Sequence, residues 1–196
     1  MSAQQQTLPT APHSEAASRV IALVSPHDGH VAIGPALPDD LGALFLWLND
    51  AAAARTDMPY RPLDCAAFKQ WMDNQTVSGH VLFVIRTLAP SRAVGFVDFK
   101  NFNLVFRSAE LGVRIGTEKD RGMGYGSRAI ALALAHAWNS LNLHRVSLTV
   151  FADNDRAISA YRRAGFCEEG VLRHAAFVEG RWRDMLAMST LNPREF

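Results

Sequence analysis

Runs of apolar residues predict several strands in this chain. Residues 81–85 read Val-Leu-Phe-Val-Ile, an unbroken apolar run typical of a strand buried on both faces. The same kind of pattern predicts further strands over residues 20–24, 30–33, 93–99, 108–115, 145–151, 171–177 and 182–190. The last two are expected to pair as a hairpin across Glu179-Gly180.

Apolar residues at helical spacing predict helices between these strands. In the first helix, which Asp39 or Asp40 is expected to cap, Leu41, Leu44 and Leu48 share one face. Further helices are predicted over residues 63–72, 127–141 and 155–164. Strands and helices in alternation, together with hairpins, indicate an α/β (α+β) fold around a mixed sheet.

A glycine-rich segment precedes the third of these helices. It reads Arg121-Gly122-Met123-Gly124-Tyr125-Gly126, and glycine at every second position disfavours both helix and strand. A glycine loop that leads into a helix N-terminus suits an anion, because unpaired N–H groups and the helix dipole converge there. We therefore predict a cradle for the pyrophosphate of a nucleotide-like ligand, with a surface turn as the alternative.

The loop differs from two well-known phosphate-binding motifs. A P-loop needs a Lys after its last glycine, and none follows here. A dinucleotide fingerprint needs its third glycine where this chain has Ser127. The loop by itself therefore leaves the ligand open.

Length and composition predict one ordinary globular domain. The chain has 196 residues, of which 48% are hydrophobic, so it can bury a normal core. Residues 1–18 are rich in Gln, Pro, Ala and Ser and are expected to form a disordered leader before a single domain over residues 19–196. The net charge of +1 does not indicate a nucleic-acid or membrane surface.

Other features of the sequence bear on the cellular compartment and on the presence of a metal site. No apolar run is long enough to span a membrane, and residues 1–11 lack the form of a signal peptide. Cys65 and Cys167 are far apart and are expected to be reduced thiols, as in a cytoplasmic protein. Neither the cysteines nor the histidines have metal-ligand spacing, so no metal site is expected.

Six segments in a fixed order resemble the GNAT N-acetyltransferase superfamily. They are Glu110–Gly116, Arg121–Gly126, Leu141–Val146, Asn154–Ile158, Tyr161–Phe166 and Glu169–Arg173. The chain looks most like the RimJ/RimL-type branch, which includes relatives that act on ribosomal-protein N-termini, polyamines or antibiotics. The resemblance implies a GNAT fold: a mixed, mostly antiparallel sheet of six to seven strands, splayed in a V and flanked by about four helices.

The resemblance also implies acetyl-CoA as the cosubstrate. Its diphosphate would lie on the glycine loop, and its pantetheine arm along the backbone of Val113–Ile115. By this carry-over the cofactor-binding residues are Val113, Arg114, Ile115, Arg121, Gly122, Met123, Gly124, Tyr125, Gly126, Ser127, Asn154 and Ile158. For two of these the local pattern offers another role, because Ser127 and Asn154 can also cap helices, with Asp155 as a competing cap.

Two residues are candidates for the chemistry. Tyr161 matches the family's general acid, whose phenol protonates the departing CoA thiolate, and the alternative is a core aromatic. Glu110 is the candidate base, and the alternatives are an ion pair with Arg114 or Arg107, or deprotonation through water alone. A backbone N–H near Val113 is expected to stabilise the oxyanion.

The acceptor side is less defined. Trp47, Asp50 and Tyr60 are candidate substrate-binding residues, although packing in the core is favoured for Trp47. The function predicted is transfer of an acetyl group from acetyl-CoA to a primary amine, by direct attack in a ternary complex. The amine is either a protein N-terminus or a small molecule.

Two alternatives to this function stay open. One is a non-catalytic CoA-binding module that keeps the fold, and the other is an unrelated protein that binds ATP or NAD on the glycine loop. A homodimer through the C-terminal hairpin or a sheet edge is a further hypothesis.

Overall fold

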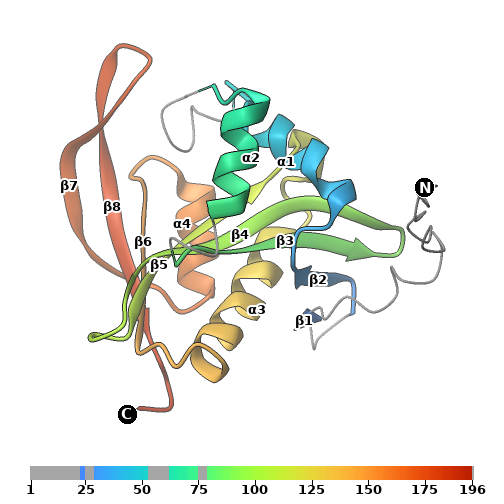
Figure 1. Cartoon of the computed structure of the whole chain (residues 1–196). Helices are drawn as coiled ribbons and strands as arrows, with labels where there is room; N and C mark the ends of the chain where they lie inside the picture. Colours follow the sequence, from blue (N-terminus) through green and yellow to red (C-terminus); the bar gives the residue numbers. More distant parts are fainter. Residues whose placement is uncertain (1–22, 25–28, 53–61, 75–78, 196) are drawn as a thin grey trace, which may run out of the picture.

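The computed structural model describes residues 23–24, 29–52, 62–74 and 79–195. They form one eight-stranded sheet in the order β1-β2-β3-β4-β5-β6-β8-β7 (Figure 1). The strands are β1 (Leu23–Val24), β2 (Val31–Gly34), β3 (Val81–Leu88), β4 (Ser91–Asn103), β5 (Ser108–Ile115), β6 (Arg145–Phe151), β7 (Cys167–Val178) and β8 (Arg181–Leu191). All neighbours are antiparallel except β5 and β6. This confirms the mixed, mostly antiparallel sheet. The eight strands correspond to the eight that the apolar runs predict, one more than the resemblance implies.

Helices cover both faces of the sheet in the part of the chain that is described. The helices α1 (Leu41–Leu48) and α2 (Cys65–Asn74) lie on one face, and α3 (Tyr125–Asn139) and α4 (Asp155–Arg163) on the other (Figure 1). A larger apolar core lies on the side of α3 and α4. A smaller core lies beneath α1 and α2 and contains Leu44, Trp47, Phe68, Val84 and Phe96. The arrangement confirms the predicted four helices.

The N-cap residues of α4 and α3 are Asn154 and Gly124. Asn154 caps α4, because its Oδ1 accepts the Ala157 N–H at 3.2 Å, so the competing cap Asp155 is wrong. The helix α3 begins at Tyr125, with Gly124 at the N-cap, so Ser127 is a residue of its first turn and not the predicted cap.

Asp40 occupies the N-cap position of α1, as predicted, but its side chain makes no capping hydrogen bond. Asp40 holds the preceding 3₁₀ turn (Pro38–Asp40) instead, where its carboxylate accepts the Leu37 N–H at 2.6 Å. It also forms an ion pair with Arg86 on β3. The carboxylate therefore fastens the start of α1 to the sheet and does not bond to the helix's first turn.

The sheet opens between its two central strands. Residues Ser108–Glu110 of β5 pair with Arg145–Ser147 of β6, and the pairing stops there. Beyond that point β5 continues along β4 to Ile115, and β6 continues along β8 to Phe151. The two strands therefore diverge, which confirms the V-shaped splay.

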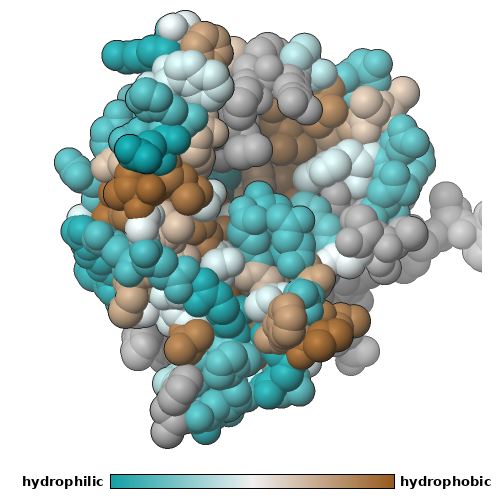
Figure 2. All heavy atoms as spheres, turned by 90° about the vertical axis from the view of Figure 1, so that its left-hand side faces the viewer, coloured by the Kyte–Doolittle hydropathy of each residue, from teal (hydrophilic) through white to brown (hydrophobic). Residues whose placement is uncertain are grey.

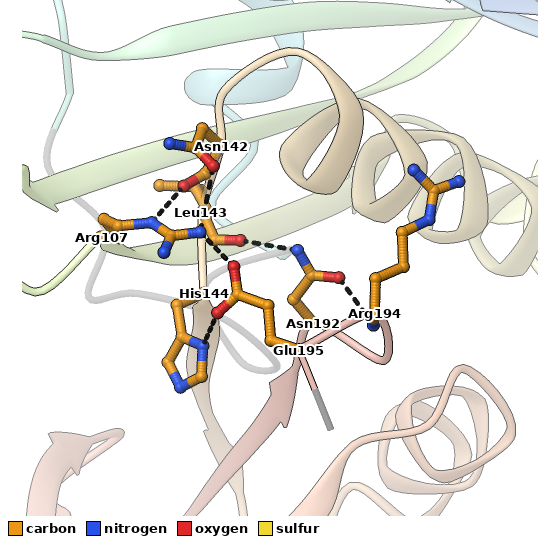
Figure 3. Close-up of polar contacts among 7 residues, drawn as sticks. All are labelled: Arg107, Asn142, Leu143, His144, Asn192, Arg194 and Glu195. Carbon is orange, nitrogen blue, oxygen red and sulfur yellow. Dashed lines mark hydrogen bonds and ion pairs between the residues drawn. The ribbon is translucent and has the colours of Figure 1, made fainter.

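The closed end of the V is fastened by residues that follow β8. Glu195 forms an ion pair with Arg107, and its Oε2 lies 2.5 Å from His144 Nδ1 (Figure 3). Asn192 donates to the Leu143 carbonyl at 3.3 Å. These contacts join the segments that enter β5 and β6, so the strands stay together at this end and separate at the other.

The strands β7 and β8 form the predicted C-terminal hairpin. Its turn residues Glu179 and Gly180 both have positive φ, at 51° and 78°. Large apolar side chains on this hairpin are exposed, among them Val171, Phe177 and Trp182. Figure 2 shows this side of the molecule, where apolar groups stand among polar ones. The homodimer hypothesis stays a prediction.

Candidate active site

A cleft of about 450 Å³ fills the space between the diverging strands. Its walls come from β5, the glycine loop, the start of α3, the end of β6 and one side of α4. Predicted site residues that line it are Glu110, Val113, Arg114, Ile115, Arg121, Gly122, Gly124, Tyr125, Gly126, Ser127, Asn154 and Tyr161. The structure therefore brings together both catalytic candidates and most of the predicted cofactor-binding residues.

The backbone of β5 presents hydrogen-bonding groups to this cleft. The Gly116 N–H donates to the Val94 carbonyl at 2.9 Å, and alternate residues of an antiparallel strand point to opposite neighbours. The N–H and C=O groups of Leu111, Val113 and Ile115 therefore point away from β4, towards the opening. A ligand that carries amide groups can bind along such an edge.

Arg114 differs from its two neighbours on β5. Its backbone faces β4, and its guanidinium donates to the Trp47 carbonyl at 2.9 Å. The same guanidinium lies 5.8 Å from the centre of the Phe96 ring. Arg114 therefore ties β5 to α1, whereas Val113 and Ile115 supply the backbone groups that face the cleft.

The glycine loop has the conformation that its sequence predicts. Gly122 and Gly124 have φ values of 85° and 78°, which L-residues with a side chain rarely adopt. The Arg128 guanidinium donates to the Met123 carbonyl at 3.2 Å and closes the loop from the helix side. The first N–H groups of α3 have no partners within the helix, so the positive end of its dipole lines the cleft.

Arg92 and Asp120 anchor the segment that leads into this loop, a feature that no motif predicts. Arg92 donates to both carboxylate oxygens of Asp120, at 3.0 and 2.5 Å, and Thr117 Oγ1 donates to one of them at 2.6 Å. The Arg92 hydrogen bond above all, helped by Thr117, holds the pKa of Asp120 below its usual range. The pairing also offsets a negative charge beside the predicted phosphate site.

Tyr161 both packs in the core and lines the cleft. It is 8% exposed, and its ring meets Phe166 edge-on with 5.7 Å between the ring centres. Asn154 likewise combines its cap with a place in the cleft wall. Ile158, which was predicted to contact the cofactor, is 4% exposed and packs in the larger core.

Glu110 lies where β5 and β6 begin to separate. Its Oε1 is 3.3 Å from Lys100 Nζ on β4, and its Oε2 accepts a hydrogen bond from Asn101 at 2.8 Å. The predicted ion-pair partners Arg107 and Arg114 are therefore wrong, because Lys100 is the residue directly across the strand pair. The Glu110 side chain is 30% exposed and lines the cleft.

Of the three predicted substrate-binding residues, Trp47 and Asp50 are not among the residues that line the cleft, and Tyr60 lies outside the described residues. Trp47 is 8% exposed and packs in the smaller core, as the packing interpretation expects. Asp50 accepts a hydrogen bond from the Ala52 N–H at 2.9 Å in the turn after α1. Tyr60 belongs to the residues that the structure does not describe.

The described residues contain neither a cluster of metal-binding side chains nor a membrane-spanning helix. Within residues 23–24, 29–52, 62–74 and 79–195, no three His, Cys, Asp or Glu side chains are placed to hold a metal ion. In the same part of the chain, no helix has the length and apolar character needed to cross a membrane.

Comparison with known proteins gives consistent results. The acetyltransferase (GNAT) domain family matches residues 30–167. The spermidine N(1)-acetyltransferase of Vibrio cholerae is 34% identical over 106 residues, which cover 54% of this chain and 61% of that protein. Its counterpart in Escherichia coli K12 is 37% identical over 94 residues, covering 48% of this chain and 50% of that protein. The chain thus spans less than two thirds of either relative.

A solved structure has a similar fold over most of the chain. The crystal structure of spermidine N-acetyltransferase from Vibrio cholerae in complex with CoA and spermine matches with a TM-score of 0.76 and 25% identity. The match covers 83% of this chain and 96% of that one. With the V-shaped sheet, the glycine loop and the family match in agreement, the chain belongs to the GNAT acetyltransferase domain family.

Proposed function

We propose that this chain transfers the acetyl group of acetyl-CoA to a primary amine of a polyamine, by direct attack in a ternary complex. One observation carries the proposal. The unpaired backbone edge of β5, the glycine loop and the Tyr161 side chain all line a single cleft between β5 and β6. A polyamine is the acceptor class because the relatives described above are spermidine acetyltransferases.

Acetyl-CoA has matching groups along the cleft. Its diphosphate is placed at the N-terminus of α3, where N–H groups from the glycine loop and Arg121 provide positive charge. Its pantetheine amides pair with the backbone of Val113 and Ile115 as an added strand would. Asn154, whose oxygen caps α4, supplies its amide N–H groups to the same arm.

The reaction needs an oxyanion site and an acid. As the amine attacks, charge builds on the thioester oxygen, and the Val113 N–H is the donor that stabilises it. The C–S bond then breaks, and the Tyr161 hydroxyl protonates the sulfur. The site of Tyr161 supports this role, since its low exposure keeps water from competing for the thiolate.

The amine must lose protons during the reaction. Glu110 accepts one either directly or through water, because its carboxylate lines the cleft where the strands begin to separate. Its Oε1 lies 3.3 Å from Lys100 Nζ, which holds the carboxylate at this position in the cleft wall. The alternative is that the amine loses this proton to water alone, without a base from the protein.

Two finer assignments accompany the proposal. We place the chain in the RimJ/RimL-type branch, on the six sequence segments that resemble that branch. We also propose a cytoplasmic location, which two free cysteines among the described residues support.

An acceptor panel tests the function. Release of the CoA thiol is followed with acetyl-CoA and, in turn, spermidine, an aminoglycoside, an amino acid and peptides with free N-termini. The proposal expects spermidine to have the highest kcat/KM. A peptide with a higher kcat/KM would move the acceptor to protein N-termini. Tight acetyl-CoA binding without turnover of any amine would favour the non-catalytic module.

A further inference from the structure

A buried carboxylate–imidazole pair lies on the α2 side of the sheet, outside the machinery described above. Asp98 Oδ2 on β4 is 2.5 Å from Nε2 of His80, and the two side chains are 11% and 16% exposed. The His80 ring also meets Trp71 of α2, with 6.1 Å between the ring centres. A carboxylate is buried at a cost in free energy, so a pair placed next to a cleft is a candidate for function.

A glycine brings this carboxylate close to a residue of the cleft wall. Asp98 pairs with Gly112 across the two strands, on the sheet face that also carries Glu110 and Arg114. A Cβ atom at residue 112 would collide with Asp98 Oδ1. Gly112 itself lines the cleft, so Asp98 Oδ1 neighbours a residue of the cleft wall that carries no side chain.

The other charges on this face have cationic or carbonyl partners. Glu110 is paired with Lys100, and Arg114 donates to a backbone carbonyl of α1. The partner of Asp98 is the imidazole of His80 and not a Lys or Arg side chain. Of the two carboxylates on this face, Glu110 and Asp98, Asp98 is therefore the one without a Lys or Arg partner among the described residues.

We propose that Asp98 binds a cationic nitrogen of the acceptor, with His80 as a positioning residue. The inference rests on the proposed function and specifies its acceptor. The nitrogen that attacks the thioester must be neutral, whereas the neighbouring amine of a diamine or polyamine stays protonated. Asp98 Oδ1 receives that charged neighbour and so selects acceptors with more than one amine. No bond is made or broken in this step.

The Asp98→Asn variant tests the inference against two acceptors. Because a hydrogen bond between charged groups is lost, we expect the KM for spermidine to rise about 10- to 100-fold. The KM for butylamine, which has no second charge, changes less than about twofold, as does the KM for acetyl-CoA. Asp73→Asn removes the same charge from an exposed position on α2 and is expected to leave all three values unchanged.

Variants of His80 separate positioning from structure. His80→Gln keeps an N–H donor for Asp98 and is expected to retain a KM for spermidine within a few-fold of wild type. His80→Leu has no such donor and is expected to raise that KM about tenfold. Thermal unfolding of each variant shows whether the protein is folded.

Two results overturn the inference. In one, Asp98→Asn raises the KM for spermidine and butylamine equally; in the other, it changes neither. If wild type acetylates no amine, the proposed function fails, and calorimetry still tests the site. In that case spermidine is titrated into the CoA complexes of wild type and Asp98→Asn. Equal affinities would then reject the role of Asp98.

Discussion

Arg145 and Glu169 form a two-pronged ion pair that crosses the C-terminal strands. The guanidinium nitrogens lie 2.7 and 2.5 Å from the two carboxylate oxygens. Ser189, on the intervening strand β8, donates to Glu169 at 2.7 Å and accepts from Arg145 at 2.8 Å. The two charged residues belong to separate sequence segments that resemble the family, and the fold joins them across β6, β8 and β7.

This pair predicts a dependence of stability on pH. The Arg145 hydrogen bond first, and then Ser189, lower the pKa of Glu169 from 4.5 to about 2. A lowered folded-state pKa means that the stabilisation is full above about pH 4.5 and is lost as the pH falls towards about 2. Because both side chains are about a third exposed or more, we expect about 1 kcal/mol or less.

The measurement is urea unfolding of wild type and Glu169→Gln at pH 7 and pH 3. The difference in unfolding free energy between the two proteins is expected to shrink at the lower pH. A difference that is the same at both pH values would show that Glu169 is not the group responsible.

Gly116 is predicted to be required for the packing of α1 on the sheet. A Cβ atom at this position would collide with the indole of Trp47, which is buried. Overpacking of this kind costs about 1–3 kcal/mol, so Gly116→Ala is expected to lower the unfolding free energy by that amount. Gly42→Ala is the matched control, since nothing lies within 4 Å of its Cβ and the residue is in a helix. Equal stabilities for the two variants would contradict the packing argument.

Gly124 is predicted to be needed for cofactor binding. Its φ of 78° and its closeness to the Arg128 guanidinium both oppose a side chain. Gly124→Ala is expected to weaken acetyl-CoA binding about tenfold or more, measured by calorimetry, because the loop must change shape. Gly180→Ala has the same φ in the distant β7–β8 turn and controls for backbone strain. If both variants bind acetyl-CoA as wild type does, the loop is not the diphosphate site.

The anchor between Arg92 and Asp120 is predicted to stabilise the start of the same loop. Asp120 is 4% exposed, so Arg92→Gln leaves a buried carboxylate without its strongest partner. We expect a loss of about 1–3 kcal/mol in unfolding free energy and a higher KM for acetyl-CoA. Lys69→Gln breaks an exposed helix pair and is expected to cost about 0.5 kcal/mol at most. An equal loss of unfolding free energy in the two variants would contradict a stabilising role for the Arg92–Asp120 pair.

Tyr161→Phe separates catalysis from binding. The ring is retained, so its contact with Phe166 and the fold are expected to stay intact. Loss of a general acid typically slows turnover about 10²-fold or more, and we expect kcat to fall by that amount while CoA affinity holds. A kcat within a few-fold of wild type would exclude the hydroxyl as the acid.

Local patterns in the sequence predicted most elements of this fold. The strands β5 and β6 occupy the predicted residues, because each is a regular run bounded by turn-forming residues. The predicted start of α3 at residue 127 is two residues late, because the glycines at 124 and 126 interrupt the apolar periodicity of its first turn. Local pattern correctly predicts Asp40 at the N-cap of α1 but not the partner of its carboxylate, because Arg86 lies on a distant strand.

The candidate site was predictable where it depends on contiguous residues. The glycine loop and Asn154 could be read from a short segment. The partner of Glu110 could not, because Lys100 is placed opposite it by the register of β4 and β5. The Asp98–His80 pair joins residues 18 apart that share no motif, and the role of Gly112 depends on strand pairing. Such contacts depend on which strands pair and in which register, and a local sequence pattern does not give that information.

The most direct test of the function is to identify the product. Acetyl-CoA and spermidine are incubated with the protein, and mass spectrometry follows the amine while thiol release follows CoA. The proposal predicts acetylated spermidine and CoA thiol in equal amounts. Thiol release without any acetylated amine, or no reaction with spermidine or any other primary amine, would contradict it.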